Sequence, residues 1–160
     1  MTATVDSTNE RRRISIHLVR RFIDAINDSW NVAAMRELIS EDFLFVIPFA
    51  PDWFPVRCEG RDKALEFMDT VRELMEPENL HDVQLDTLAG NPDEVIARYK
   101  SDTRMKSTNL PYRNEYIGRF TVRDQRLTLF AEYLDPTRFV IALGGRVDPP
   151  AAWLVREASS

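Results

Sequence analysis

The sequence predicts one α+β domain in which helices gather on one face of an antiparallel sheet. The chain has 160 residues, and domains typically have roughly 100 to 200 residues. Its first half carries apolar residues mainly at helical spacing, whereas its second half alternates apolar and polar residues as half-buried strands do. Runs of helices followed by runs of strands are typical of α+β folds.

The composition is that of a globular protein without general affinity for nucleic acid. Hydrophobic residues make up 44% and charged residues 29%, and 21 basic against 26 acidic side chains give a net charge of −5. Positive charge is concentrated only at residues 11–13, which we interpret as a solvated helix start. The longest apolar run, residues 43–50, is far shorter than the ~20 residues of a membrane helix. We therefore expect no nucleic-acid and no membrane partner.

The sequence lacks the familiar cofactor and metal motifs. GxGxxG, phosphate-loop, HExxH and CxxC patterns are all absent. Two histidines, His17 and His81, are too few for a multi-histidine metal centre. The lone Cys58 has no disulfide partner and no obvious neighbouring base. We expect no cofactor and no metal and, without a signal-peptide pattern, a reducing cytoplasmic location.

Two helices are predicted at the start of the chain. Residues 1–9 are small and polar and are expected to form a flexible leader. From about Glu10, apolar residues recur at every fourth position, which indicates a long amphipathic helix. Either Asn31 or Ser29 is positioned to cap a second, shorter helix.

Two strands and a third helix are expected next. Residues 43–49 are continuously apolar, which suits a strand buried on both faces. Residues 56–59 alternate as a short second strand that ends at Gly60. Gly60 or Asp62 begins the third helix, and Pro77 follows its end.

Four long strands are predicted after the third helix, because alternating patterns fill most of the second half of the chain. Long strands that cover three helices must coil strongly, which leaves a concave side with a natural cavity. We assign the domain to residues 10–143 and a C-terminal tail to residues 144–160. The apolar patch of the tail, residues 153–155, is expected to seek a partner surface.

The last hairpin, residues 112–135, places a single acid, Glu132, on one apolar face of its final strand. A two-residue turn sets Glu132 opposite Ile117, on a wet face. A three-residue loop with a bulge sets it opposite Tyr116, on the pocket side, although Gln125 then takes a position that favours glycine. We favour the bulged loop, because the other register buries a costly group of charges: Arg113, Glu115 and Arg119.

Several segments resemble the NTF2-like superfamily, and within it the SnoaL-like branch that includes phenazine-biosynthesis A/B-type proteins. The similarity spans about residues 12–139 and is carried by PYRNEY, FTVRD and EYLDP, at residues 111–116, 120–124 and 132–136, and by FVIPFAP and EGR, at residues 45–51 and 59–61. The resemblance implies a cone-shaped barrel, usually a homodimer, with an apolar pocket. It also implies that Glu132 is the acid/base residue.

Two related reaction types fit the sequence less well. In ketosteroid isomerases the base lies on the first strand, which here contains no acid, and the positions of their tyrosine and oxyanion-hole acid are occupied by Phe22 and Tyr116. Relatives that hydrolyse limonene epoxide use an Arg-x-Asp pair, of which the segment Arg98-Tyr99-Lys100 keeps only the arginine.

The candidate site is therefore centred on Glu132. Surrounding rings would keep water from its carboxyl group and raise its pKa, and Tyr116 and Asn114 would orient a substrate or stabilise an oxyanion. The substrate-binding candidates are all aromatic: Phe45, Phe49, Trp53, Tyr112 and Phe130. The structural alternative is that Glu132 pairs with Arg98 and only holds the sheet together.

We expect a cofactor-independent acid/base catalyst, an isomerase, cyclase or condensing enzyme, that acts on a small apolar metabolite in secondary metabolism. The alternatives are a binding protein without catalysis and an epoxide-hydrolase-like enzyme. A homodimer is expected from the exposed face of the sheet and the apolar tail. The fold alone does not separate these classes.

Overall fold

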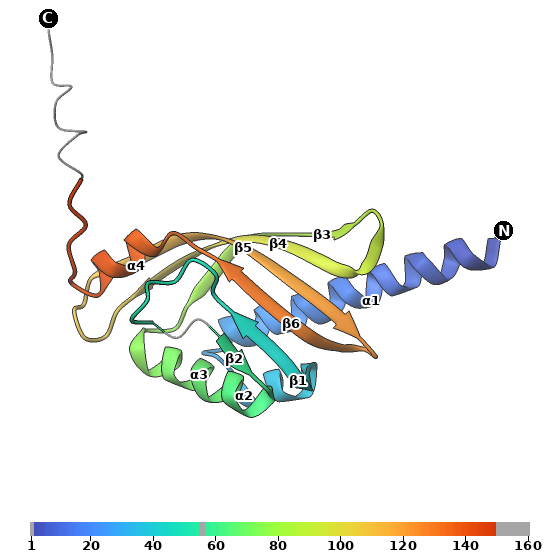
Figure 1. The fold of residues 1–160 in the computed structure, drawn as a ribbon, viewed down its shortest axis with the longest axis horizontal. Helices are drawn as coiled ribbons and strands as arrows, with labels where there is room; N and C mark the ends of the chain where they lie inside the picture. Colours follow the sequence, from blue (N-terminus) through green and yellow to red (C-terminus); the bar gives the residue numbers. More distant parts are fainter. Residues whose placement is uncertain (1, 55–56, 150–160) are drawn as a thin grey trace, which may run out of the picture.

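Residues 2–54 and 57–149 are described by a computed structural model, and in this part of the chain four helices pack on an open six-stranded sheet (Figure 1). The helices are α1 (Thr2–Asn27), α2 (Val32–Leu38), α3 (Arg61–Leu74) and α4 (Pro136–Ala142). The strands are β1 (Ile39–Val46), β2 (Arg57–Glu59), β3 (Asn79–Leu88), β4 (Asn91–Arg104), β5 (Pro111–Arg123) and β6 (Arg126–Tyr133).

The sheet has the strand order β2-β1-β6-β5-β4-β3. Strand β1 runs parallel to β6, and all other neighbours are antiparallel. Helix α1 packs on β3 and β4, α3 packs on β1, and the short α4 lies against β5 (Figure 1). The predicted α+β class is confirmed as an NTF2-like fold whose sheet stays open instead of closing into a barrel.

The ends of the domain differ from the sequence-based prediction. Helix α1 begins at Thr2, so residues 2–9 are helical where a leader was expected. Helix α4 was not predicted, although Asp135 caps it by accepting a hydrogen bond from the Thr137 amide at 2.9 Å and Pro136 occupies its first turn. The apolar tail segment, residues 153–155, lies outside the described residues. No described helix is both long and apolar enough to cross a membrane.

The sheet's first strand is more one-sided than predicted. It covers residues 39–46 instead of 43–49, with Phe43 and Phe45 buried and Leu44 and Val46 only half-buried. The second strand and third helix are confirmed to within a residue or two. Alternating exposure arises because the described helices gather on one face of the sheet.

Both alternative capping assignments are settled. Asn31 caps α2, since its Oδ1 accepts from the Ala34 amide at 3.0 Å. Gly60 precedes α3 with a φ of 91°, a conformation that side-chain-bearing residues rarely adopt.

The last hairpin takes neither predicted register. Asp124 and Gln125 both have positive φ, 49° and 57°, and form a two-residue turn closed by the pair of Arg123 and Arg126. A bulge then shifts the pairing, so that Glu132 lies opposite Gly118 instead of Tyr116 or Ile117. The predicted three-residue loop is thus wrong, but the bulge restores the predicted result that Glu132 shares the inner face.

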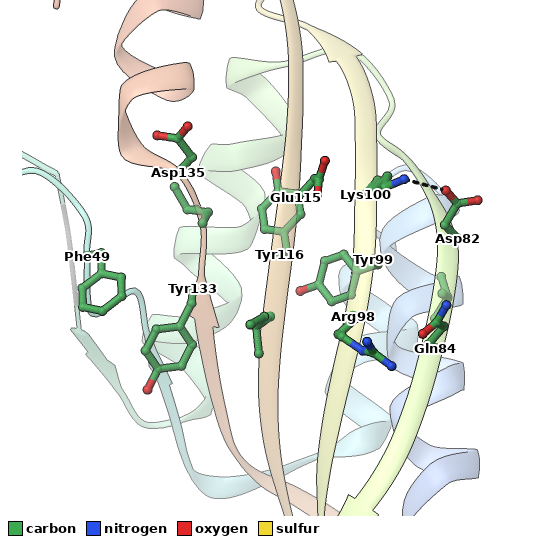
Figure 2. Close-up of a pocket in the computed structure, with 13 residues that line it drawn as sticks. Phe49, Asp82, Gln84, Arg98, Tyr99, Lys100, Glu115, Tyr116, Tyr133 and Asp135 are labelled. Atoms are coloured by element: carbon green, nitrogen blue, oxygen red, sulfur yellow. Dashed lines mark hydrogen bonds and ion pairs between the residues drawn. The ribbon is translucent and has the colours of Figure 1, made fainter.

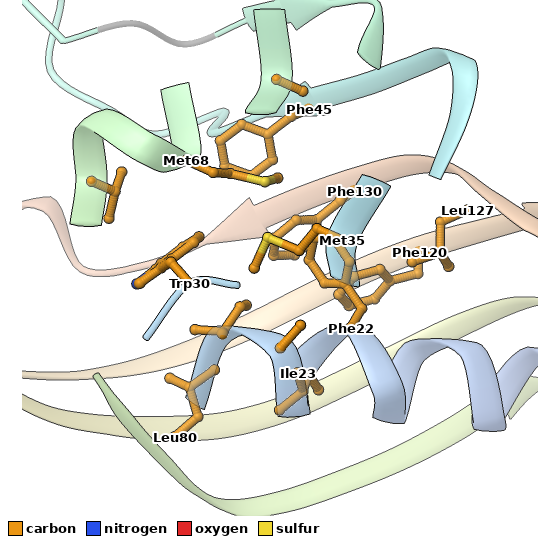
Figure 3. Packing of buried hydrophobic residues seen from close by; sticks show 14 of the residues in the cluster. Phe22, Ile23, Trp30, Met35, Phe45, Met68, Leu80, Phe120, Leu127 and Phe130 are labelled. Atoms are coloured by element: carbon orange, nitrogen blue, oxygen red, sulfur yellow. The ribbon is translucent and has the colours of Figure 1, made fainter. Parts of the chain in front are cut away.

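The core is built around stacked phenylalanine rings. Phe22 of α1 contacts Phe43, Phe120 and Phe130 at ring-centroid distances of 6.3, 5.9 and 5.6 Å. Phe120 and Phe130, paired across β5 and β6, stack at 4.3 Å. Figure 3 shows Phe22, Phe120 and Phe130 between the helices and the sheet, with Met35 of α2 and Met68 of α3 nearby. This layer supports one end of the cavity described next.

Candidate active site

A narrow cavity of about 50 Å³ lies between the inner face of the sheet and the helices. Its polar lining consists of two carboxylic acids, Glu78 and Glu132, two tyrosines, Tyr112 and Tyr116, and the indole of Trp30. The described lining residues include no lysine, arginine or histidine. Apolar side chains complete the wall, among them Ile26, Phe45, Ile47, Phe54, Phe67 and Phe139.

Glu132 is held in the cavity by a tyrosine from two strands away. The Tyr99 hydroxyl of β4 donates a hydrogen bond to Glu132 Oε1 of β6 at 2.6 Å. Gly118 of β5 pairs with Ala97 and with Glu132, so it lies between the two strands. A Cβ atom at Gly118 would lie 3.3 Å from the Tyr99 ring and 2.8 Å from the Phe120 ring. Glycine therefore leaves the space through which Tyr99 reaches Glu132.

Burial makes Glu132 a group that titrates near neutrality. Loss of solvation raises its pKa to about 7. The hydrogen bond from Tyr99 stabilises the carboxylate and so acts in the opposite direction, lowering the pKa. The structural alternative, a pair with Arg98, is contradicted. Arg98 is exposed on the other face of β4, with Asp86 at 3.7 Å. That position also excludes Arg98 from an epoxide-hydrolase-type site with Glu132.

A second acid, Glu78, was missed by the sequence analysis. It lies between α3 and β3, is 7% exposed, and accepts a hydrogen bond from the Tyr116 hydroxyl at 3.3 Å. Its pKa is raised to about 8, mainly by desolvation and to a smaller extent by the nearby charge of Glu132. No periodic pattern marks this position, because Pro77 and Glu78 belong to a linker.

The tyrosine hydroxyl groups form a connected network beside the acids. Tyr116 OH lies 3.1 Å from Ser101 Oγ and 3.1 Å from Tyr112 OH. The ring of Tyr116 stacks on that of Tyr99 at 5.1 Å. Burial raises the pKa of all three tyrosines, so they act as hydroxyl donors at neutral pH.

The structure brings together only part of the predicted site. Glu132, Tyr116, Tyr112 and Phe45 all line the cavity. Phe130 does not line it; the ring is fully buried in the phenylalanine layer.

Asn114, Phe49 and Trp53 lie away from the cavity lining. The Asn114 amide donates to Tyr112 OH and to the Asp135 carbonyl, both at 3.0 Å, which suits a positioning role. Phe49 and Trp53 are each 62% exposed, and the pocket wall from this loop comes instead from its neighbours Ala50, Pro51 and Phe54.

A second, open groove of about 880 Å³ lies on the opposite face of the sheet, away from α1 (Figure 2). Its rim is charged, and Lys100 Nζ lies 3.1 Å from Asp82 Oδ2. Exposed apolar groups are interspersed, with Ile117 50% exposed. Because the groove is open, it shields its charged groups from water less than the inner cavity does.

None of the described residues forms a group of three or more histidine, cysteine, aspartate or glutamate side chains placed to hold a metal ion. The fold and the cavity define a class: a small α+β protein with a narrow cavity lined by aromatic rings and buried carboxylic acids. The SnoaL-like domain family matches residues 19–130, and the chain belongs to this family.

Individual relatives agree with this assignment. The uncharacterized protein YesE of Bacillus subtilis (strain 168) is 31% identical over 117 residues, covering 72% of this chain and 78% of YesE. A solved Bacillus subtilis structure, described as an isomerase candidate, superimposes with a TM-score of 0.78 at 24% identity, covering 85% of this chain and 96% of that one. A phenazine biosynthesis-related protein from Pseudomonas aeruginosa gives 0.76 at 16% identity, covering 91% and 94%. The two structural matches show the shared fold.

Proposed function

We propose that this protein is a cofactor-independent acid/base catalyst that acts on a small, largely apolar carbonyl compound, as an isomerase or cyclase of secondary metabolism. The observation that carries the proposal is the Glu132 carboxyl group, which lies among aromatic rings and accepts a hydrogen bond from Tyr99, with no cationic partner among the described residues. A pKa of about 7 makes both its acid and base forms available at neutral pH. Because the cavity has a volume of only about 50 Å³, it favours substrates whose reacting part contains few atoms.

The corresponding reaction begins with proton removal. The Glu132 carboxylate takes a proton from a carbon next to a carbonyl group. The C–H electron pair then forms a C=C bond, and the π pair of the carbonyl moves to the oxygen, which a hydroxyl donor stabilises. Return of a proton to the same or a conjugated carbon completes exchange or isomerisation. Tyr116 is the predicted hydroxyl donor that lines the cavity.

Replacing Glu132 by glutamine is expected to lower this activity by about 10²- to 10⁴-fold, because the amide cannot accept the proton. The measurement is deuterium uptake at the α-carbons of acetone, butanone and cyclopentanone in D₂O, followed by NMR. Glu66→Gln, at an exposed acid of α3 outside the cavity and the groove, is the matched control and should retain wild-type rates. Equal rates for Glu132→Gln and wild type would remove Glu132 from the mechanism.

We also propose a homodimer formed through the open groove. The groove carries charges of both signs, among them Arg98, Lys100, Asp82 and Glu115, so two copies can pair them across a two-fold axis. Light scattering should report twice the mass of one chain at micromolar concentration, and Ile117→Asp should shift this value towards one chain. A wild-type mass of one chain would contradict the proposal.

A further inference from the structure

Glu78 reaches the cavity from the linker between α3 and β3, which contributes no residue to the function proposed above. It follows α3 in the chain, whereas Glu132 lies on β6, and both side chains line the same narrow cavity. Glu78 is less exposed than Glu132, and its Oε1 atom accepts a hydrogen bond from the Tyr116 hydroxyl. The cavity therefore receives two acids from two different elements.

Nothing charged among the described lining residues compensates for Glu78. The titratable groups that face it are acids or phenols: Tyr112 and Tyr116 from β5, Glu132 from β6 and Tyr99 from β4. From the turn between α1 and α2 it is approached by the uncharged indole of Trp30. A buried acid without a counter-ion is expensive in its ionised form, so Glu78 is held as a neutral proton carrier.

The indole of Trp30 gives a second observation that points to a ligand. Trp30 is 6% exposed and lines the cavity, and its Nε1–H has no acceptor at hydrogen-bond distance in the described part of the chain. The indole approaches the Glu78 carboxyl group and weakly favours its carboxylate form, but the contact does not meet hydrogen-bond geometry. Because a buried donor without an acceptor is costly, this N–H is suited to an acceptor atom that arrives with a ligand.

We propose that Glu78 is the proton donor of the site and that it binds, together with the Trp30 N–H, the carbonyl oxygen of a substrate whose acidic C–H faces Glu132. The inference rests on the proposed function and deepens it. It names the substrate class as a neutral ketone or enone with an enolisable hydrogen, and it divides the acid and base roles between two carboxyl groups. Tyr116, which donates to Glu78, is a positioning residue in this scheme.

The proton balance closes within the two acids. Glu132 gains the proton that leaves the α-carbon, the C–H electron pair forms the C=C bond, and the π pair of the carbonyl moves to oxygen and takes the proton of Glu78. The product of this step is an enol, with Glu132 neutral and Glu78 ionised. Reversal at the same carbon gives exchange, and protonation at a conjugated carbon gives an isomer.

The test is the pH dependence of ketone deuteration by the full chain. Activity requires ionised Glu132 and neutral Glu78, so the wild-type rate should rise through about pH 7 and fall through about pH 8. Glu78→Gln should lower the maximum rate about 10- to 100-fold and remove the falling limb, because an amide stays neutral at every pH. Glu76→Gln, an exposed acid in the same linker, is the control and should keep the wild-type profile.

The outcomes separate the two proposals. If Glu132→Gln is inactive while Glu78→Gln keeps the wild-type rate and both limbs, the role of Glu78 is overturned and the proposed function stands. If neither substitution changes the rate, or if wild type deuterates none of the ketones, both fall. Should Glu78→Gln not fold, ¹³C NMR of the wild-type carboxyl groups decides the matter, since Glu78 found ionised at pH 7 would overturn its role as donor.

Discussion

The free energy of unfolding should fall as the pH rises from about 5 to about 9, and the double variant Glu78→Gln/Glu132→Gln should remove most of this loss. Both acids have an ordinary pKa of 4.5, which in the folded protein rises to about 8 for Glu78 and about 7 for Glu132. At low pH both are neutral in folded and unfolded chains, so their burial costs little. Between 4.5 and the raised values the unfolded chain ionises first and gains free energy. The expected loss is on the order of 5 kcal/mol.

Urea denaturation of wild type and double variant at a series of pH values measures this effect. The comparison is made above about pH 5, because surface carboxyl groups act in the opposite direction in acid. Ion pairing and hydrogen bonds lower the pKa of Asp42 and Asp135, so their contribution is lost as the pH falls. Glu66→Gln controls for removal of one exposed charge. Parallel curves for wild type and double variant would show that neither acid is desolvated.

The position of Glu132 was predictable because it depends on a local pattern. One acid among alternating apolar residues marks the inner face of a strand, and the cost of burying arginines selects that face. The turn itself was not predictable from preference alone. Asp124 and Gln125 both adopt positive φ although neither is glycine. The two-residue turn alone would place Glu132 on the outer face, and the bulge between the Val122–Leu127 and Thr121–Leu129 pairs moves it to the inner face.

The rest of the site depends on contacts between distant segments. Tyr99 reaches Glu132 only because Gly118 leaves space on the strand between them, a relation that appears once three strands are in register. Glu78 lies in a linker with no periodicity, so its burial follows from how α3 meets β3. Aromatic character alone predicted binding residues poorly, because it marks core rings such as Phe130 and exposed rings such as Phe49 equally well.

Replacing Phe130 by alanine is expected to lower the free energy of unfolding by about 3 to 5 kcal/mol. The ring is fully buried, stacks on Phe120 at 4.3 Å and contacts Phe22 and Phe45 at 5.6 and 5.1 Å, so its removal opens a void that these rings cannot fill without moving. Urea denaturation at about pH 6 measures the change, and exposed Phe49 replaced by alanine should cost less than about 1 kcal/mol.

This substitution also separates two roles for Phe130. Replacing a ring that contacts substrate by alanine weakens substrate binding and changes stability little. Replacing a ring that only supports the core lowers stability and changes substrate binding little. Because Phe45 lines the cavity and packs on Phe130, the alanine variant should affect ketone deuteration only through the shifted Phe45 ring. If the Phe130→Ala protein is as stable as wild type but no longer deuterates ketones, Phe130 contacts the substrate after all. The cavity would then extend further towards the phenylalanine layer.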